Sequence, residues 1–148
     1  MSLIENKNLI LNYIEKVWNQ ADLVNFRKLT TTTFTFSIRG EPAIERTLME
    51  QYVQAMHAAF PDWRIEVIDL IAEDNRVVAH WHGKVTHLGS FKEIPPSGKH
   101  IHVSGINIYH IEDGKIISEW EQTDTLGMLQ QMGLIPNRYQ TKLQREAT

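Results

Sequence analysis

The sequence contains no cysteine, which excludes disulfide bonds, thiolate metal sites and cysteine nucleophiles. It has no apolar run near the roughly 18 residues that a membrane-spanning helix needs. Its first segment, MSLIENKNLI, lacks the basic start of a signal peptide. These absences predict a cytoplasmic protein with no membrane partner.

Strong charge of one sign is also missing. The net charge is −3, the isoelectric point is about 6.1, and the lysines and arginines are scattered. The sequence therefore offers no basic surface for nucleic acid. It also lacks a glycine-rich phosphate loop, a G-x-S-x-G motif and a dinucleotide fingerprint. These absences leave two possibilities: acid/base chemistry on an apolar ligand, or ligand binding without chemistry.

The chain has 148 residues, of which 42% are hydrophobic and 22% charged. This length and composition are typical of one globular domain with a real core. We expect a single domain over residues 1–148 with a polar tail from about residue 135.

Three helices are predicted within the first 60 residues. Ser2 and Glu5 form a capping box that opens a helix over residues 3–19. Asp22 can cap a second, short helix. Thr47 and Glu50 form another capping box, predicting a third helix that ends before Pro61.

Strand signals dominate elsewhere. The segment TTTTFTFSI, residues 30–38, is β-branched and aromatic. After residue 62 the stretches WRIEVIDLIA, RVVAHWHGKVTH, KHIHVSGINIYHI and IISEWEQTD alternate, and EDGK carries an Asp-Gly hairpin signal. Helices followed by a meander predict an α+β fold, with a curved antiparallel sheet packed against three helices and enclosing a pocket.

Asp124 is the candidate catalytic residue, because it ends a strand on the same face as Trp120 and Gln122. If that face looks into the pocket, desolvation would raise the pKa of Asp124 and suit it to proton transfer. Alternatively, Asp124 only caps the helix that follows. Sequence spacing leaves both interpretations open.

Six of the seven histidines lie between residues 80 and 110. They are His80, His82, His87, His100, His102 and His110. The alternating pairs could meet across a hairpin, but no HExxH motif or nearby acidic ligand accompanies them, so we predict no metal. A histidine assisting Asp124 fits better, and His102 and His110 are both candidates.

Aromatic side chains predict the walls of the pocket. Trp81 and Trp120 lie on strands that would line it and could hold a flat hydrophobic molecule. Further candidate substrate-binding residues are His82, Gln122 and Tyr13. The loop HLGSFKEIPPSG, with its glycines and prolines, reads as a stiff lid.

Four motifs carry a resemblance to a known family: T-H-x-G-x-F, I-P-P-x-G, D-G-K-I-x-x-x-W and D-x-L-G-x-x-x-Q-x-G. From about residue 5 to 134 the chain resembles the SnoaL-like polyketide cyclases, also called ester cyclases. The resemblance implies the α+β cone of the nuclear-transport-factor-two superfamily, pairing of cones into a homodimer, and a cofactor-independent aldol-type ring closure. It carries the acid/base role to Asp124 and an accompanying histidine role to His110.

One family pattern is absent. Where the cyclases carry D-F-x-x-H, this chain has Thr33 and Ser37 in place of the aspartate and the histidine. Two hypotheses therefore stand. The first is a cyclase-type enzyme, or an isomerase or hydrolase using the same carboxylate. The second is a binding protein for small apolar ligands.

Overall fold

The computed structural model describes residues 2–38 and 40–136. The predicted capping box is confirmed, since Ser2 and Glu5 bind each other's backbone N–H at the start of α1, Leu3–Tyr13. The predicted first helix continues as the π-helical segment η1, Ile14–Asn19.

Of the caps predicted for the next two helices, one is confirmed and one is wrong. Asp22 caps α2, Leu23–Leu29, as predicted, accepting a hydrogen bond from the backbone N–H of Asn25 at 3.0 Å. The predicted capping box at Thr47 is wrong, because Glu45 caps α3, Arg46–Ala59, through the backbone N–H groups of Thr47 and Leu48. The helix therefore starts before its predicted cap.

Six strands form one sheet in the order β2-β1-β6-β5-β4-β3. They are β1 Thr30–Ile38, β2 Ile44–Glu45, β3 Ile65–Glu73, β4 Arg76–Thr86, β5 His100–Glu112 and β6 Lys115–Thr123. The predicted meander is confirmed as β3 to β6, joined by antiparallel pairs. β1 adds to β6 in parallel, which the antiparallel prediction did not include.

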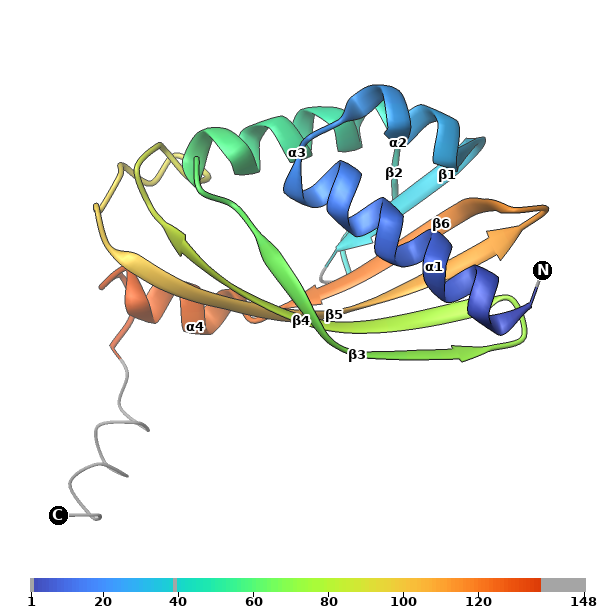
Figure 1. Ribbon diagram of the computed structural model, residues 1–148. Helices are drawn as coiled ribbons and strands as arrows, with labels where there is room; N and C mark the ends of the chain where they lie inside the picture. The colour runs from blue at the N-terminus through green and yellow to red at the C-terminus, as the bar shows by residue number, and fades with distance from the viewer. Residues whose placement is uncertain (1, 39, 137–148) are drawn as a thin grey trace, which may run out of the picture.

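The sheet is curved, and α1, α2 and α3 cover its concave face (Figure 1). The side of the sheet facing these helices is called the inner face below, and the opposite side the outer face. Alternate residues of β4 and β5 are buried on the inner face, among them Val77, Ala79, Val103 and Tyr109. This confirms the predicted α+β architecture.

The loop between β4 and β5 lies beside the C-terminal end of α3 (Figure 1). His87 anchors it: its Nδ1 lies 2.9 Å from the Ser97 hydroxyl and 3.2 Å from the Ser97 backbone N–H. Two backbone N–H groups of the loop, those of Leu88 and Gly89, donate to the Ala59 carbonyl. The loop is thus held against the helix end.

A short last helix, α4, Thr125–Gln131, follows β6 and lies beside β5 on the side away from α1 (Figure 1). Most of the predicted polar tail, residues 137–148, lies outside the described residues. Within the described part of the chain, the helices are all too short or too polar to cross a membrane.

Candidate functional site

A β-bulge in β6 decides which side chains face the helices. Ile116 pairs with Ile111, but Ser118 pairs with His110, so Ile117 is an extra residue in β6. An extra residue reverses the alternation beyond it. Glu119 and Glu121 consequently face inward and are buried, at 1% and 5% exposure, and Trp120 between them faces outward.

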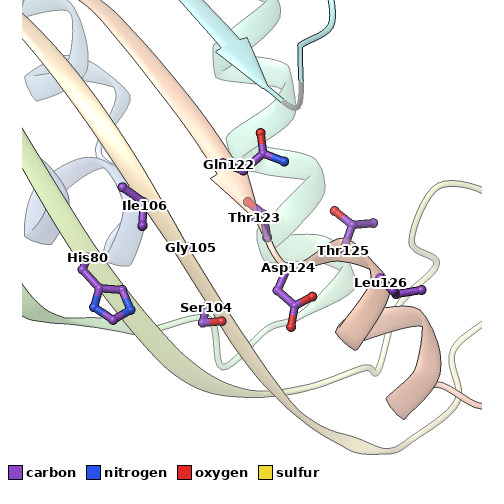
Figure 2. A pocket seen from close by; sticks show the side chains of 9 residues that line it. All are labelled: His80, Ser104, Gly105, Ile106, Gln122, Thr123, Asp124, Thr125 and Leu126. Atoms are coloured by element: carbon purple, nitrogen blue, oxygen red, sulfur yellow. The ribbon is translucent and has the colours of Figure 1, made fainter. Parts of the chain in front are cut away.

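Asp124 lies on the exposed surface, where β6 passes into α4 (Figure 2). Its Oδ1 accepts the backbone N–H of Gly127 at 2.9 Å, so the capping interpretation is confirmed. The expectation that this carboxylate opens into a dry, enclosed pocket is wrong. It lines an open depression of about 540 Å³ instead, together with His80, Ser104, Gly105, Ile106, Gln122, Thr123, Thr125 and Leu126.

Trp120 and Gln122 share the strand face of Asp124, as predicted, but it is the outer face. Trp120 is 39% exposed. Its predicted place in the wall of an enclosed pocket is therefore wrong for the single chain, and the same holds for Gln122.

The strand histidines also lie on the outer face. His80 and His82 alternate along β4, and His82 Nε2 lies 3.6 Å from a Glu66 carboxylate oxygen. Among the residues described, no group of three or more histidine, aspartate and glutamate side chains has the geometry of a metal site.

The two histidines predicted to assist Asp124 have other contacts. His102 is bound through its backbone, whose N–H and C=O both pair with the Gln131 side-chain amide. His110 Nε2 lies 3.0 Å from the Asn75 amide nitrogen. His110 pairs with Ser118, six residues before Asp124, which is roughly 20 Å along a strand. The structure does not bring His110 to Asp124.

Tyr13 and Trp81, the remaining predicted site residues, are buried on the inner side. The Tyr13 hydroxyl donates to Glu119 at 2.7 Å, from α1 across to β6. The Trp81 indole N–H donates to the Asn107 side-chain oxygen at 2.8 Å. The predicted set is therefore divided by the sheet, with these two residues inside and the others outside.

Glu119 is the centre of a buried polar network. Besides Tyr13, it accepts hydrogen bonds from the Trp18 indole N–H at 2.9 Å and from the Asn107 amide at 2.7 Å. Donors from η1, α1 and β5 converge on one carboxylate, so the network holds the helices to the sheet.

Asn107 connects Glu119 to a second carboxylate. Its amide nitrogen lies 2.7 Å from Glu119 and 3.3 Å from Glu121, and its oxygen accepts from Trp81. The Thr123 hydroxyl donates to the other Glu121 oxygen at 2.8 Å. Gly105 faces the Trp81 ring, and a Cβ there would lie 2.4 Å from it. The glycine thus lets this tryptophan lie against the sheet beside Asn107.

Burial controls the charge states of the network. It raises the pKa of Glu119 above the ordinary value, and the hydrogen bonds from Tyr13, Trp18 and Asn107 oppose that rise. Burial, and then the Glu119 charge, raise the pKa of Tyr13 and Tyr109 well above the ordinary range. Both phenols are therefore neutral donors at physiological pH.

The sequence analysis did not identify Glu119, Glu121 or Asn107. The available signal was the segment SEWEQ, where two carboxylates share one face and a tryptophan takes the other. A pair of buried carboxylates joined through an amide is chemically suited to accepting and returning a proton.

The comparisons with known proteins agree with this architecture. Residues 8–132 match the family profile described as SnoaL-like polyketide cyclase. No curated protein sequence gives a significant match. Among solved structures, AclR from Streptomyces galilaeus, a proposed hydroxylase, is 25% identical with a TM-score of 0.86 over 99% of this chain and 92% of its own.

Two further solved structures show the same fold. A proposed SnoaL-like polyketide cyclase from Jannaschia sp. CCS1 is 20% identical, with a TM-score of 0.83 over 90% of this chain and 94% of its own. IdmH from Streptomyces antibioticus, a proposed polyketide cyclase, is 23% identical, with a TM-score of 0.76 over 86% and 98% of the two chains.

Proposed function

Because this chain belongs to the SnoaL-like polyketide cyclase family, we propose that it transfers protons on a small hydrophobic ketone or ester, as in a cyclase-type ring closure. The observation that carries this proposal is the buried pair Glu119 and Glu121, joined through Asn107 on the inner face. The sequence pointed to Asp124 as the general acid and base. Its exposure and its capping bond favour an inner carboxylate for that role instead.

Glu121 is the better placed of the two inner carboxylates. Glu119 already accepts three hydrogen bonds, which fix both of its oxygens in the network. Glu121 follows it by two residues, towards the end of β6, and has Asn107 and Thr123 among its hydrogen-bond donors. In the proposed arrangement Glu119 holds Asn107, and Asn107 orients Glu121 for reaction.

The proposed chemistry balances without a cofactor or metal. Glu121 takes a proton from the carbon next to a carbonyl, and the C–H electron pair becomes the double bond of an enolate. The enolate carbon then bonds to a second carbonyl carbon of the same molecule, and the resulting alkoxide takes the proton back from Glu121. General acid/base help of this kind is typically worth about 10² to 10⁴ in rate.

Deuterium exchange tests the first step without the natural substrate. With 1-tetralone in D₂O as the probe, wild-type protein should accelerate exchange at the carbon next to the carbonyl, followed by proton NMR. Glu121→Gln should lower the catalysed rate by about 10² or more. Asp124→Asn should leave it within about twofold, because asparagine also caps helices well. Cyclisation and hydroxylation beside a carbonyl can both begin with this proton removal, so the assay covers both.

The outcomes separate the alternatives. If Asp124→Asn abolished exchange and Glu121→Gln did not, the general base would be Asp124 in the outer depression. Binding of 1-tetralone with no exchange above the uncatalysed rate would support the ligand-binding protein and overturn the enzyme.

We also propose that two copies pair through the outer face of the sheet. In support, β5 and β6 present large apolar side chains there: Ile106 is 45% exposed, Ile108 37% and Trp120 39%. Isolated exposed apolar residues need no explanation, but a row on neighbouring strands is typical of an interaction surface. Pairing would cover Trp120 and place the depression beside Asp124 near a second copy.

A further inference from the structure

The indole N–H of Trp63 is an exception among the buried tryptophans. Trp18 donates to Glu119 and Trp81 donates to Asn107. Trp63 is only 6% exposed, yet its Nε1 has no hydrogen-bond partner among the described residues. Leaving such a donor unsatisfied costs about 1 to 3 kcal/mol, so this N–H is open to an acceptor from outside the described part of the chain.

Trp63 lies next to the buried network. It stands in the connection between α3 and β3, and its ring packs edge-on against Trp81 with the centroids 6.5 Å apart. Trp81 in turn binds Asn107, which contacts Glu121. A continuous row therefore runs from Trp63 through Trp81 and Asn107 to the proposed catalytic carboxylate.

Further aromatic rings pack beside Trp63 at this end of the row. Phe60 packs against Trp63 at 5.9 Å between centroids, and Phe91 of the β4–β5 loop packs against Phe60 at 5.4 Å. A molecule held here would meet ring faces and edges on several sides. Such walls suit a flat, largely apolar ligand, for which one well-placed polar group fixes the orientation.

We propose that the Trp63 indole N–H binds a carbonyl oxygen of a flat aromatic ketone or ester that lies along Trp81. An indole N–H can donate but not accept, so the ligand group it meets must be an acceptor such as a ketone or ester oxygen. This inference rests on the proposed function in one respect, namely that the reacting part of the bound ligand points towards Glu121. It names a specificity residue that would reject the same ring system without its oxygen, since the buried donor would then stay unpaired.

A pair of probes isolates this hydrogen bond. 1-Tetralone and tetralin share a ring skeleton, and only the ketone carries an acceptor. Trp63→Phe, which keeps an aromatic ring but removes the N–H, should weaken 1-tetralone binding about fivefold and change tetralin binding less than twofold. Trp120→Phe, on the outer face, is the matched control and should change neither affinity.

A second measurement needs no variant. In the wild-type protein labelled with ¹⁵N, the Trp63 indole proton should shift downfield as 1-tetralone is added, and tetralin should not reproduce that shift. Equal losses for both probes in Trp63→Phe, equal indole shifts, or no binding of 1-tetralone would each overturn the assignment. Selective 1-tetralone binding through Trp63 with no deuterium exchange would uphold it and would remove only the acid/base role of Glu121.

Discussion

At the scale of single residues, Glu119 shows how a buried carboxylate can organise a fold. Its oxygens accept from Tyr13, Trp18 and Asn107, which belong to three different elements. Without it, the Trp18 indole N–H would lose its hydrogen bond in the interior, and Tyr13 and Asn107 would each lose the shortest of their hydrogen bonds. Removing one partner from such a network is expensive, because the remaining groups stay buried without a hydrogen bond.

We expect Glu119→Gln to lower the free energy of unfolding by about 1 to 3 kcal/mol at pH 4.5. The amide has one acceptor oxygen, and its NH₂ group would face donors already aimed at that position. Urea denaturation at equilibrium measures the change. The matched control is Glu73→Gln at an exposed position of β3, where little change is expected.

The pH dependence of that difference follows from the raised pKa of Glu119, which lies above the ordinary 4.5 in the folded protein. Between 4.5 and the raised value, the folded protein binds more protons than the unfolded chain. The contribution of Glu119 is therefore fully present below pH 4.5 and declines as the pH rises through this window. The stability difference between wild type and Glu119→Gln should accordingly shrink as the pH rises from 4.5 to about 7. A difference that grows over that range would contradict this account.

At the scale of secondary-structure elements, the sequence predicted the helices and strands well but assigned one face of β6 wrongly. Alternation counted from Ile116 places Trp120 and Gln122 on the core side, with Asp124 next in line. The bulge at Ile117 shifts the count by one residue and reverses every later side chain.

Local sequence could not reveal that reversal, because the partners that make it favourable come from elsewhere. A tryptophan ordinarily competes better than glutamate for the interior. Glu119 is buried here because donors from α1, η1 and β5 meet it, and those contacts span 106, 101 and 12 residues of sequence. The family motif D-G-K-I-x-x-x-W pointed to β6, the strand that carries the site. That Glu119 and Glu121 face inward on this strand depends on tertiary contacts, which the motif does not contain.

The tip of the β4–β5 loop is a strained element. Phe91 and Ile94 exchange both backbone hydrogen bonds around Lys92 and Glu93, whose φ angles are +46° and +66°. Side chains other than glycine pay roughly 1 to 2 kcal/mol for this left-handed conformation.

We expect Glu93→Gly to stabilise the protein by about 0.5 to 1 kcal/mol, after allowing for the greater freedom of glycine in the unfolded chain. That gain corresponds to a rise of about 1 to 4 °C in Tm for a chain of this length. Differential scanning calorimetry measures it. Ser90→Gly in the same loop, where φ is not positive, is the control and should be neutral or destabilising. A lower Tm for Glu93→Gly would show that its side chain has a stabilising contact.

At the scale of the whole molecule, the two faces of the sheet have opposite characters. The inner face is covered by α1, α2 and α3 (Figure 1) and contains the polar network. The outer face presents Ile106, Ile108 and Trp120 on its central strands. A two-fold pairing of that face would bring the same residues of both copies together. A single substitution would therefore place two altered side chains in the interface, one from each copy.

We therefore expect Ile108→Glu to convert the proposed dimer into a monomer at micromolar concentration. Two unpaired carboxylates would be buried close together, which is strongly unfavourable in an apolar interface. Light scattering coupled to size exclusion should show twice 17.2 kDa for the wild type and 17.2 kDa for the variant. Val24→Glu, on the 66% exposed side chain in α2, should leave the mass at the dimer value. Because residue 108 faces away from Glu121, the monomeric variant should still bind 1-tetralone; a dimer that survives Ile108→Glu would place the contact on a different surface.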